Sequence, residues 1–186
     1  VGISLNRGAR ELIALLATSK AGGTYVPLDP SQPPERLRSL CEDAAPQLLI
    51  LESGSSLIVD ADATVWKFDR LGDIDSNAPS EELDTSYSPD DLAYLMFTSG
   101  STGQPKAVAG TERGAVNRCD WQATAFPWAP STDVAIARTS LSFVDHVAEI
   151  WAPLIAGVPI VVLAEATGRS PWREPSVLLR TVRDFG

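Results

Sequence analysis

Residues 92–106 of the chain read LAYLMFTSGSTGQPK and join an apolar strand to a turn rich in glycine and hydroxyl groups. The run Leu92–Thr98 is continuously apolar over a length that predicts a buried strand. The turn that follows contains Gly100 and Gly103, which let the backbone bend sharply and present its N–H groups. A strand that runs directly into such a turn is typical of a loop that cradles phosphate.

The side chains of this turn are suited to anions. The turn contains four hydroxyl groups, two glycines and one cation. Its nine residues are Thr98, Ser99, Gly100, Ser101, Thr102, Gly103, Gln104, Pro105 and Lys106. Hydroxyls donate hydrogen bonds to phosphate oxygens and Lys106 adds positive charge, at about 1.5–3 kcal/mol for each charge-assisted bond. The spacing is not that of a Walker A loop, because two residues separate the glycines and Ala107 follows the lysine. The alternative, a plain hydrophilic turn, does not account for so many suitable positions after a buried strand.

On both sides of this stretch, helical and strand-like segments alternate. Helices are expected at residues 8–21, 33–41, 114–125, 144–156 and 176–185, and strands at 24–28, 47–51, 65–68, 134–137 and 158–163. This order predicts an α/β fold with largely parallel sheets flanked by helices. The acid-rich stretch 69–91 is interpreted as a solvated surface connection.

Composition excludes several classes of protein. The chain has 186 residues, 44% of them hydrophobic and 21% charged, which is incompatible with disorder of the whole chain. A net charge of −9 argues against nucleic acid as a partner, since phosphate binding needs a basic face. The longest uncharged run, Ile150–Ala164, is short and interrupted by prolines and a glycine, so we expect no membrane span.

The cysteines Cys41 and Cys119 are far apart in the sequence and the chain has one histidine, so neither a zinc site nor a disulfide framework is expected. A reducing, cytoplasmic location follows as the default. The chain begins at Val1 without a signal-peptide pattern, and we interpret it as a segment of a longer polypeptide.

Three stretches resemble the adenylate-forming enzymes, the family of acyl-CoA ligases, luciferases and nonribosomal peptide synthetase adenylation domains. Residues 92–106 resemble the phosphate-binding core of this family. KAGGTYVPLDP at residues 20–30, followed by PERL at 34–37, resembles the second core motif of the peptide synthetase branch. Ser142–Gly157 resembles the fourth core motif, which carries part of the substrate pocket. The resemblance covers nearly the whole chain and implies that residues 1–186 are a partial N-terminal subdomain of the large lobe of an adenylation domain.

The resemblance implies an enzyme that uses ATP to activate an amino acid or related carboxylic acid as its acyl-adenylate. The product would be loaded onto the phosphopantetheine thiol of a peptidyl carrier protein in nonribosomal peptide biosynthesis. Residues 98–106 would bind the β- and γ-phosphates, and Lys106 is the catalytic residue implied in this segment. Mg²⁺ is expected with ATP, with its ligands outside the segment. A small accessory protein of the MbtH type is a further partner that the resemblance allows.

The pocket motif departs from the family pattern. Members that activate amino acids usually carry aspartate directly after the phenylalanine, where it pairs with the substrate ammonium. Here Val144 follows Phe143, and the carboxylate stands one residue later, at Asp145. One residue rotates a helical side chain by about 100°, so the amine that it reaches should also move. Val144 and Asp145 are therefore predicted to bind an atypical substrate, a β-amino acid or an aspartate-like acid activated through its distant carboxylate.

Other interpretations remain open from the sequence. Val144 also suits an α-keto or hydroxy acid, and Asp145 also suits a helix N-cap. The chain could belong to a relative of acyl-CoA ligases, or to a degenerate domain that serves only for docking. Among nearby residues, His146 is expected at the surface and Glu149 is read first as a helix residue. Arg138 is assigned equally to a ligand loop or a salt bridge, and Trp121, Trp128, Trp151 and Trp172 are expected in the core.

Overall fold

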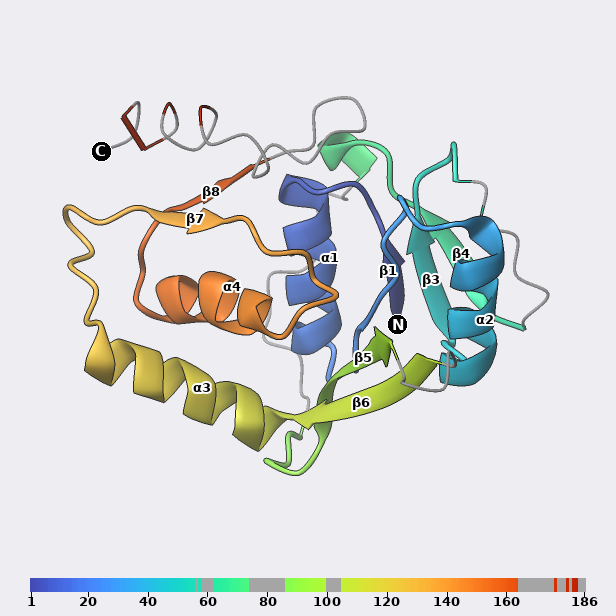
Figure 1. The fold of residues 1–186 in the computed structure, drawn as a ribbon, viewed down its shortest axis with the longest axis horizontal. Coiled ribbons are helices and arrows are strands. Elements are labelled where there is room, and N and C mark those ends of the chain that lie inside the picture. The colour runs from blue at the N-terminus through green and yellow to red at the C-terminus, as the bar shows by residue number, and fades with distance from the viewer. Residues whose placement is uncertain are drawn as a thin grey trace. The chain divides into compact units, whose positions relative to one another are not determined.

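The computed structural model describes residues 1–55, 57, 62–73, 86–99 and 105–163, together with residues 176, 180, 182 and 183. The chain divides into two compact units, Val1–Glu112 and Arg113–Gly186. Strands and helices alternate in both units, which confirms the predicted α/β class (Figure 1).

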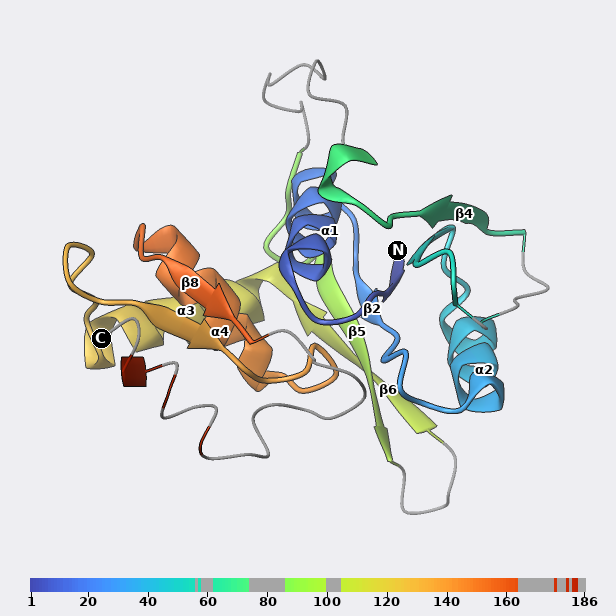
Figure 2. The same cartoon turned by 90° about the horizontal axis from the view of Figure 1, so that it is seen from above.

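The first unit is built on a sheet with the strand order β2-β1-β3-β4, in which every neighbouring pair is parallel. Its elements are β1 (Gly2–Ser4), α1 (Ala9–Lys20), β2 (Val26–Pro27), α2 (Pro34–Ala44), β3 (Leu48–Leu51), β4 (Thr64–Lys67), the 3-10 helix η1 (Leu71–Asp73), β5 (Leu92–Ser99) and β6 (Pro105–Thr111). The chain moves one way across the sheet from β1 to β2 and returns past β1 to β3. Because such crossovers are right-handed, α1 and α2 lie on opposite faces of the sheet (Figures 1 and 2).

One face of this sheet packs against α2. The buried cluster there consists of Val26, Leu28, Leu37, Leu40, Cys41, Leu49, Leu51 and Leu57. Leu49 and Leu51 are two residues apart in β3, so their side chains point to the same face. Pro34 stands in the first turn of α2, where its missing N–H removes no helical hydrogen bond.

Both ends of α1 are held in place. Beyond its C-terminus Gly22 has a φ of 70°, a left-handed conformation that favours glycine, and donates its N–H to Ser19 O at 2.9 Å. Near its N-terminus the Arg10 guanidinium donates to the backbone carbonyls of Phe68 and Asp69, both at 2.8 Å, and pairs with the Glu52 carboxylate at 2.6 Å. These acceptors follow β3 and β4, so Arg10 ties α1 to the carboxyl ends of both strands.

β5 and β6 form an antiparallel pair beside the parallel strands. Tyr25 connects the two arrangements, because its N–H donates to Ala93 O at 3.1 Å and its carbonyl accepts from the Leu95 N–H at 2.9 Å. The sequence prediction was wrong in omitting both β6 and β1. β6 is mostly exposed and mixes small and polar residues, and β1 is only three residues long, so neither shows a usable periodicity.

The second unit contains α3 (Glu112–Ala125, which begins at the boundary), β7 (Ala135–Ala137), α4 (Asp145–Ile155) and β8 (Ile160–Val162). β7 and β8 are parallel, and α4 provides the crossover that parallel neighbours need. The remaining predicted helices and strands are confirmed to within a few residues at each end. The helix predicted at 176–185 lies largely outside the described residues, as does the 74–85 part of the acidic connection.

Candidate functional site

The ends of the hairpin β5–β6 bring the two flanks of the predicted phosphate loop together. Thr98 lies opposite Lys106 in the ladder and Ser99 opposite Pro105. The Thr98 hydroxyl donates to the Lys106 carbonyl at 3.4 Å, and both side chains are exposed. The middle of the loop, Gly100, Ser101, Thr102, Gly103 and Gln104, lies outside the described residues, and the phosphate role of the loop remains a prediction.

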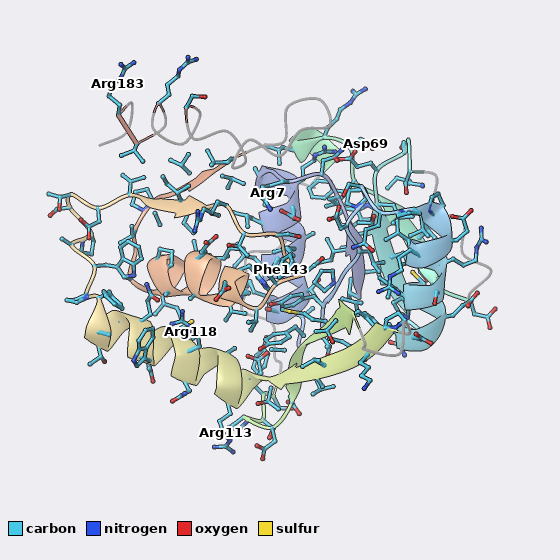
Figure 3. All side chains as sticks on the ribbon, in the orientation of Figure 1. Arg7, Asp69, Arg113, Arg118, Phe143 and Arg183 are labelled. Atoms are coloured by element: carbon cyan, nitrogen blue, oxygen red, sulfur yellow. The ribbon has the colours of Figure 1, made fainter. Side chains whose placement is uncertain are left out.

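The start of α4 presents the predicted substrate residues at the surface. Phe143 and Val144 are 66% and 54% exposed, and Figure 3 labels Phe143 in the turn that leads into the helix. Val144 is the N-cap residue and Asp145 is the first residue of the helix proper. The alternative in which Asp145 acts as the N-cap is therefore wrong. Among the described residues the Asp145 carboxylate has no hydrogen bond or salt bridge.

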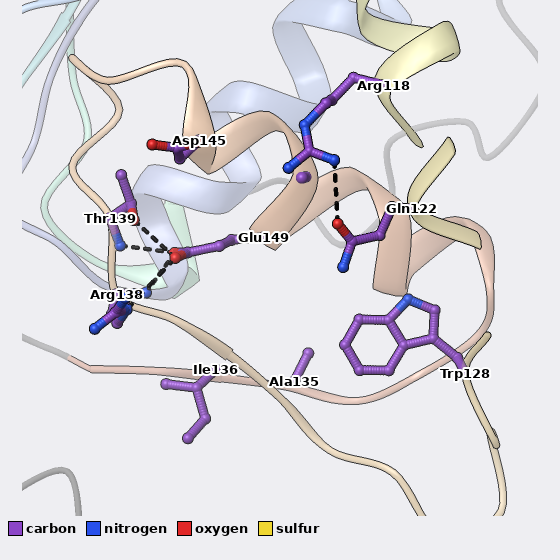
Figure 4. Close-up of a pocket in the computed structure, with 10 residues that line it drawn as sticks. Arg118, Gln122, Trp128, Ala135, Ile136, Arg138, Thr139, Asp145 and Glu149 are labelled. Carbon is purple, nitrogen blue, oxygen red and sulfur yellow. Dashed lines mark hydrogen bonds and ion pairs between the residues drawn. The ribbon is translucent and has the colours of Figure 1, made fainter. Parts of the chain in front are cut away.

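A cavity of about 320 Å³ opens beside α4 in the second unit (Figure 4). Asp145 lines it together with Ala148 and Glu149, because residues three and four apart share one face of a helix. Among the described residues its lining comes from α3, β7, α4 and their connections, and consists of Arg118, Gln122, Trp128, Ala135, Ile136, Arg138, Thr139, Asp145, Ala148 and Glu149. Val144 is not among these residues, so its substrate role stays a prediction without a contact that supports it.

Glu149 anchors the connection between β7 and α4. Its Oε2 accepts the backbone N–H groups of Arg138 at 2.9 Å and Thr139 at 2.7 Å, and its Oε1 accepts the Thr139 hydroxyl at 2.7 Å. Nε of Arg138 lies 3.7 Å from the same Oε1, which confirms the salt-bridge interpretation of that arginine. The Glu149 carboxylate therefore has a structural role, because its hydrogen bonds fix Arg138 and Thr139 in the wall of the cavity.

His146 is completely buried, and its predicted surface position is wrong. Its Nδ1 lies 2.6 Å from Phe143 O, and since a carbonyl only accepts, Nδ1 carries the proton and donates. The His146 backbone N–H points to the same oxygen at 3.1 Å. Burial lowers the pKa of His146 to about 4, so the ring is neutral at pH 7. The imidazole therefore fixes the turn that places Phe143, Val144 and Asp145.

The opposite wall of the cavity carries a cation and an unpartnered donor. Arg118 on α3 donates from Nη1 to Gln122 Oε1 at 3.2 Å, and its guanidinium lies 4.7 Å from the centre of the Trp121 ring. Trp121 is 52% exposed, so its predicted core position is wrong. Trp128 is half-buried, and its buried Nε1 has no hydrogen-bond partner among the described residues.

Sequence reasoning found Asp145 but missed Arg118, Gln122, Trp128 and Ala148. The spacing of Asp145, Ala148 and Glu149 could have identified the shared helix face, whereas nothing local relates α3 to α4. Within the described part of the chain, no group of three or more His, Cys, Asp or Glu side chains could hold a metal ion. That part also contains no helix long and apolar enough to cross a membrane.

Comparison with known proteins gives consistent matches. A family model described as "AMP-binding enzyme" matches residues 1–186. The chain is 35% identical over 174 residues to the β-alanyl-bioamine nonribosomal peptide synthetase ebony of Drosophila melanogaster, which covers 89% of this chain and 19% of ebony. It is 34% identical over 173 residues to tyrocidine synthase 3 of Brevibacillus parabrevis, covering 92% of this chain and 3% of that protein.

Among solved structures, the chain is similar to the nonribosomal peptide synthetase FmoA3 in its α-methyl-L-serine-AMP bound form. The TM-score is 0.84 at 30% identity, and the match covers 99% of this chain and 20% of FmoA3. The chain therefore spans one fifth or less of each of these three proteins.

Proposed function

Because the chain belongs to the AMP-binding enzyme family, as the N-terminal part of an adenylation domain of the nonribosomal peptide synthetase type, we propose that the full-length protein activates a β-amino acid for peptide synthesis. A carboxylate oxygen of the acid attacks the α-phosphorus of ATP. The bond from that phosphorus to the bridging oxygen breaks, so pyrophosphate leaves and the acyl-adenylate forms. The phosphopantetheine thiol of a peptidyl carrier protein then attacks the acyl carbon, and AMP leaves as the thioester forms.

The loop at residues 98–106 is proposed to bind the β- and γ-phosphates. Its flanks Thr98 and Lys106 lie opposite each other at the end of a hairpin, which supports this role. Lys106 would neutralise the charge that develops on the leaving pyrophosphate. Mg²⁺, when bound with ATP, supplies further charge neutralisation. No group of three or more metal-ligating side chains occurs among the described residues, and we assign Mg²⁺ no ligand among them.

Asp145 is proposed to bind the substrate ammonium, and its position in the cavity is the observation that carries the β-amino assignment. The carboxylate lines the cavity without a partner among the described residues, so it is available to a ligand cation. The resemblance to adenylation domains implies an ammonium-binding aspartate one residue earlier, where this chain has Val144. In a β-amino acid the amine lies one carbon farther from the reacting carboxyl group than in an α-amino acid. This shift of the amine matches the shift of the carboxylate from position 144 to Asp145. The name of the relative ebony, a β-alanyl synthetase, is consistent with the assignment.

The test is acid-dependent ATP–pyrophosphate exchange by the full-length protein with β-amino, α-amino and α-keto acids. Asp145→Asn should lower kcat/KM for β-amino acids by about 10- to 100-fold, the equivalent of one charge-assisted hydrogen bond. Lys106→Gln should instead lower exchange with every acid by a similar factor, because it acts on ATP. Asp120→Asn, an exposed carboxylate on α3 outside the cavity, is the matched control and should change nothing.

Unchanged selectivity of Asp145→Asn would eliminate the ammonium-binding role. Exchange with α-keto acids alone would favour the alternative substrate, for which Val144 is an apolar wall. Transfer of the acyl group to coenzyme A in place of a carrier protein would identify an acyl-CoA ligase. Absence of exchange with any acid would identify a docking domain.

A further inference from the structure

The cavity beside α4 holds two opposite charges that do not pair with each other. Arg118 and Asp145 both line it, yet neither forms a salt bridge with any described residue. Figure 4 shows the Arg118 guanidinium on the side of Gln122 and the Asp145 carboxylate at the start of α4. A half-buried cation and an exposed anion that line one cavity complement a ligand that carries both charges.

Arg118 is held in place for such a role. Its bond to Gln122 engages one of the five N–H groups of the guanidinium, and the Trp121 ring supports the group from one side. The other N–H groups keep the planar fork that binds a carboxylate through two parallel hydrogen bonds. Arg118 is therefore suited to binding an anion. Gln122 and Trp121 already restrict its side-chain rotamers, so it loses less conformational entropy when a ligand binds.

We propose that Arg118 forms a carboxylate-binding subsite, so that the substrate is an amino dicarboxylic acid such as aspartate, activated at its side-chain carboxyl group. This inference rests on the proposed function. Asp145 binds the ammonium, Arg118 binds the carboxylate on the same carbon, and the distal carboxylate attacks ATP. Relative to that distal carboxyl group the amine is a β-amine, which agrees with the shift of the carboxylate to Asp145.

The experiment compares L-aspartate with β-alanine in ATP–pyrophosphate exchange by the full-length protein. The two acids share the β-amine and differ in the second carboxylate. The wild type should prefer L-aspartate in kcat/KM by about tenfold or more. Arg118→Gln should remove this preference by lowering kcat/KM for L-aspartate, and denaturant unfolding of the variant checks that it is folded.

Arg113→Gln is the matched control on the same helix. Positions 113 and 118 differ by about 140° around the axis, and Figure 3 shows the two side chains on different sides of α3. The inference is overturned if the wild type prefers β-alanine, or if Arg118→Gln lowers exchange with both acids equally. Exchange with β-alanine but not aspartate would leave the proposed function standing, whereas exchange with neither would overturn that function itself.

Discussion

His146 shows how one buried side chain shapes the start of α4. As a lone histidine near the start of a helix it was expected at the surface, but the helix turns it fully inward. There the Nδ1–H group bonds to Phe143 O and desolvation disfavours the charged ring. The glutamate and aspartate nearby oppose that shift without reversing it.

We predict that His146 makes stability depend on pH. Its folded pKa of about 4 lies below the ordinary value of 6.5, so the unfolded chain binds a proton that the folded chain does not. The neutral His146 ring makes its full contribution to stability above pH 6.5. As pH falls towards 4 this contribution is lost, and the free energy of unfolding falls by about 3 kcal/mol in total. Denaturant unfolding of the adenylation domain across pH 3–7 measures this loss.

His146→Asn keeps a donor for Phe143 O and does not titrate, so it should flatten the curve between pH 4 and 6.5. Asp69→Asn is the control. Hydrogen bonds from Ser53 lower the pKa of Asp69 below 3.8, so its contribution is lost only at more acidic pH. An equal slope in wild type and His146→Asn would refute the prediction.

The hairpin β5–β6 depends on a glycine opposite an aromatic ring. Gly110 pairs with Tyr94 in the ladder, at the point where the register shifts in β5. A Cβ at Gly110 would overlap the Tyr94 ring. That ring in turn packs against Tyr25, the residue that joins the hairpin to the parallel sheet, at 5.9 Å between centroids. The packing of Tyr94 against Tyr25 therefore helps to hold the hairpin that carries Thr98 and Lys106 against the parallel sheet.

Gly110→Ala should lower the free energy of unfolding by about 1–3 kcal/mol, because the ring must move out of a packed position. Gly54→Ala is the matched control, since a methyl group there meets no atom within 4 Å. Denaturant unfolding of both variants measures the difference. In a Tyr94→Ala background the penalty should disappear, and a penalty that persists would contradict the packing explanation.

For the molecule as a whole, the chain contains only part of the proposed machinery. It spans 19% of ebony and 20% of FmoA3. The roles proposed for its motifs concern phosphate and part of the substrate pocket only. We predict that residues 1–186 alone show no measurable ATP–pyrophosphate exchange, whereas the full-length protein does. Assaying both at equal concentration tests this, and exchange by the isolated segment would show that the remaining residues are dispensable for adenylation.

The alternation of elements, the glycine- and hydroxyl-rich turn and the position of Asp145 after Val144 were all readable from the sequence. Each depends on neighbouring residues, through helical spacing, proline and glycine positions, or a short motif. The pairing of β6 with β5, the burial of His146 and the meeting of Arg118 with Asp145 in one cavity were not readable. They join segments that no local pattern relates, and only tertiary packing decides which distant backbone groups pair and which polar side chains share a cavity.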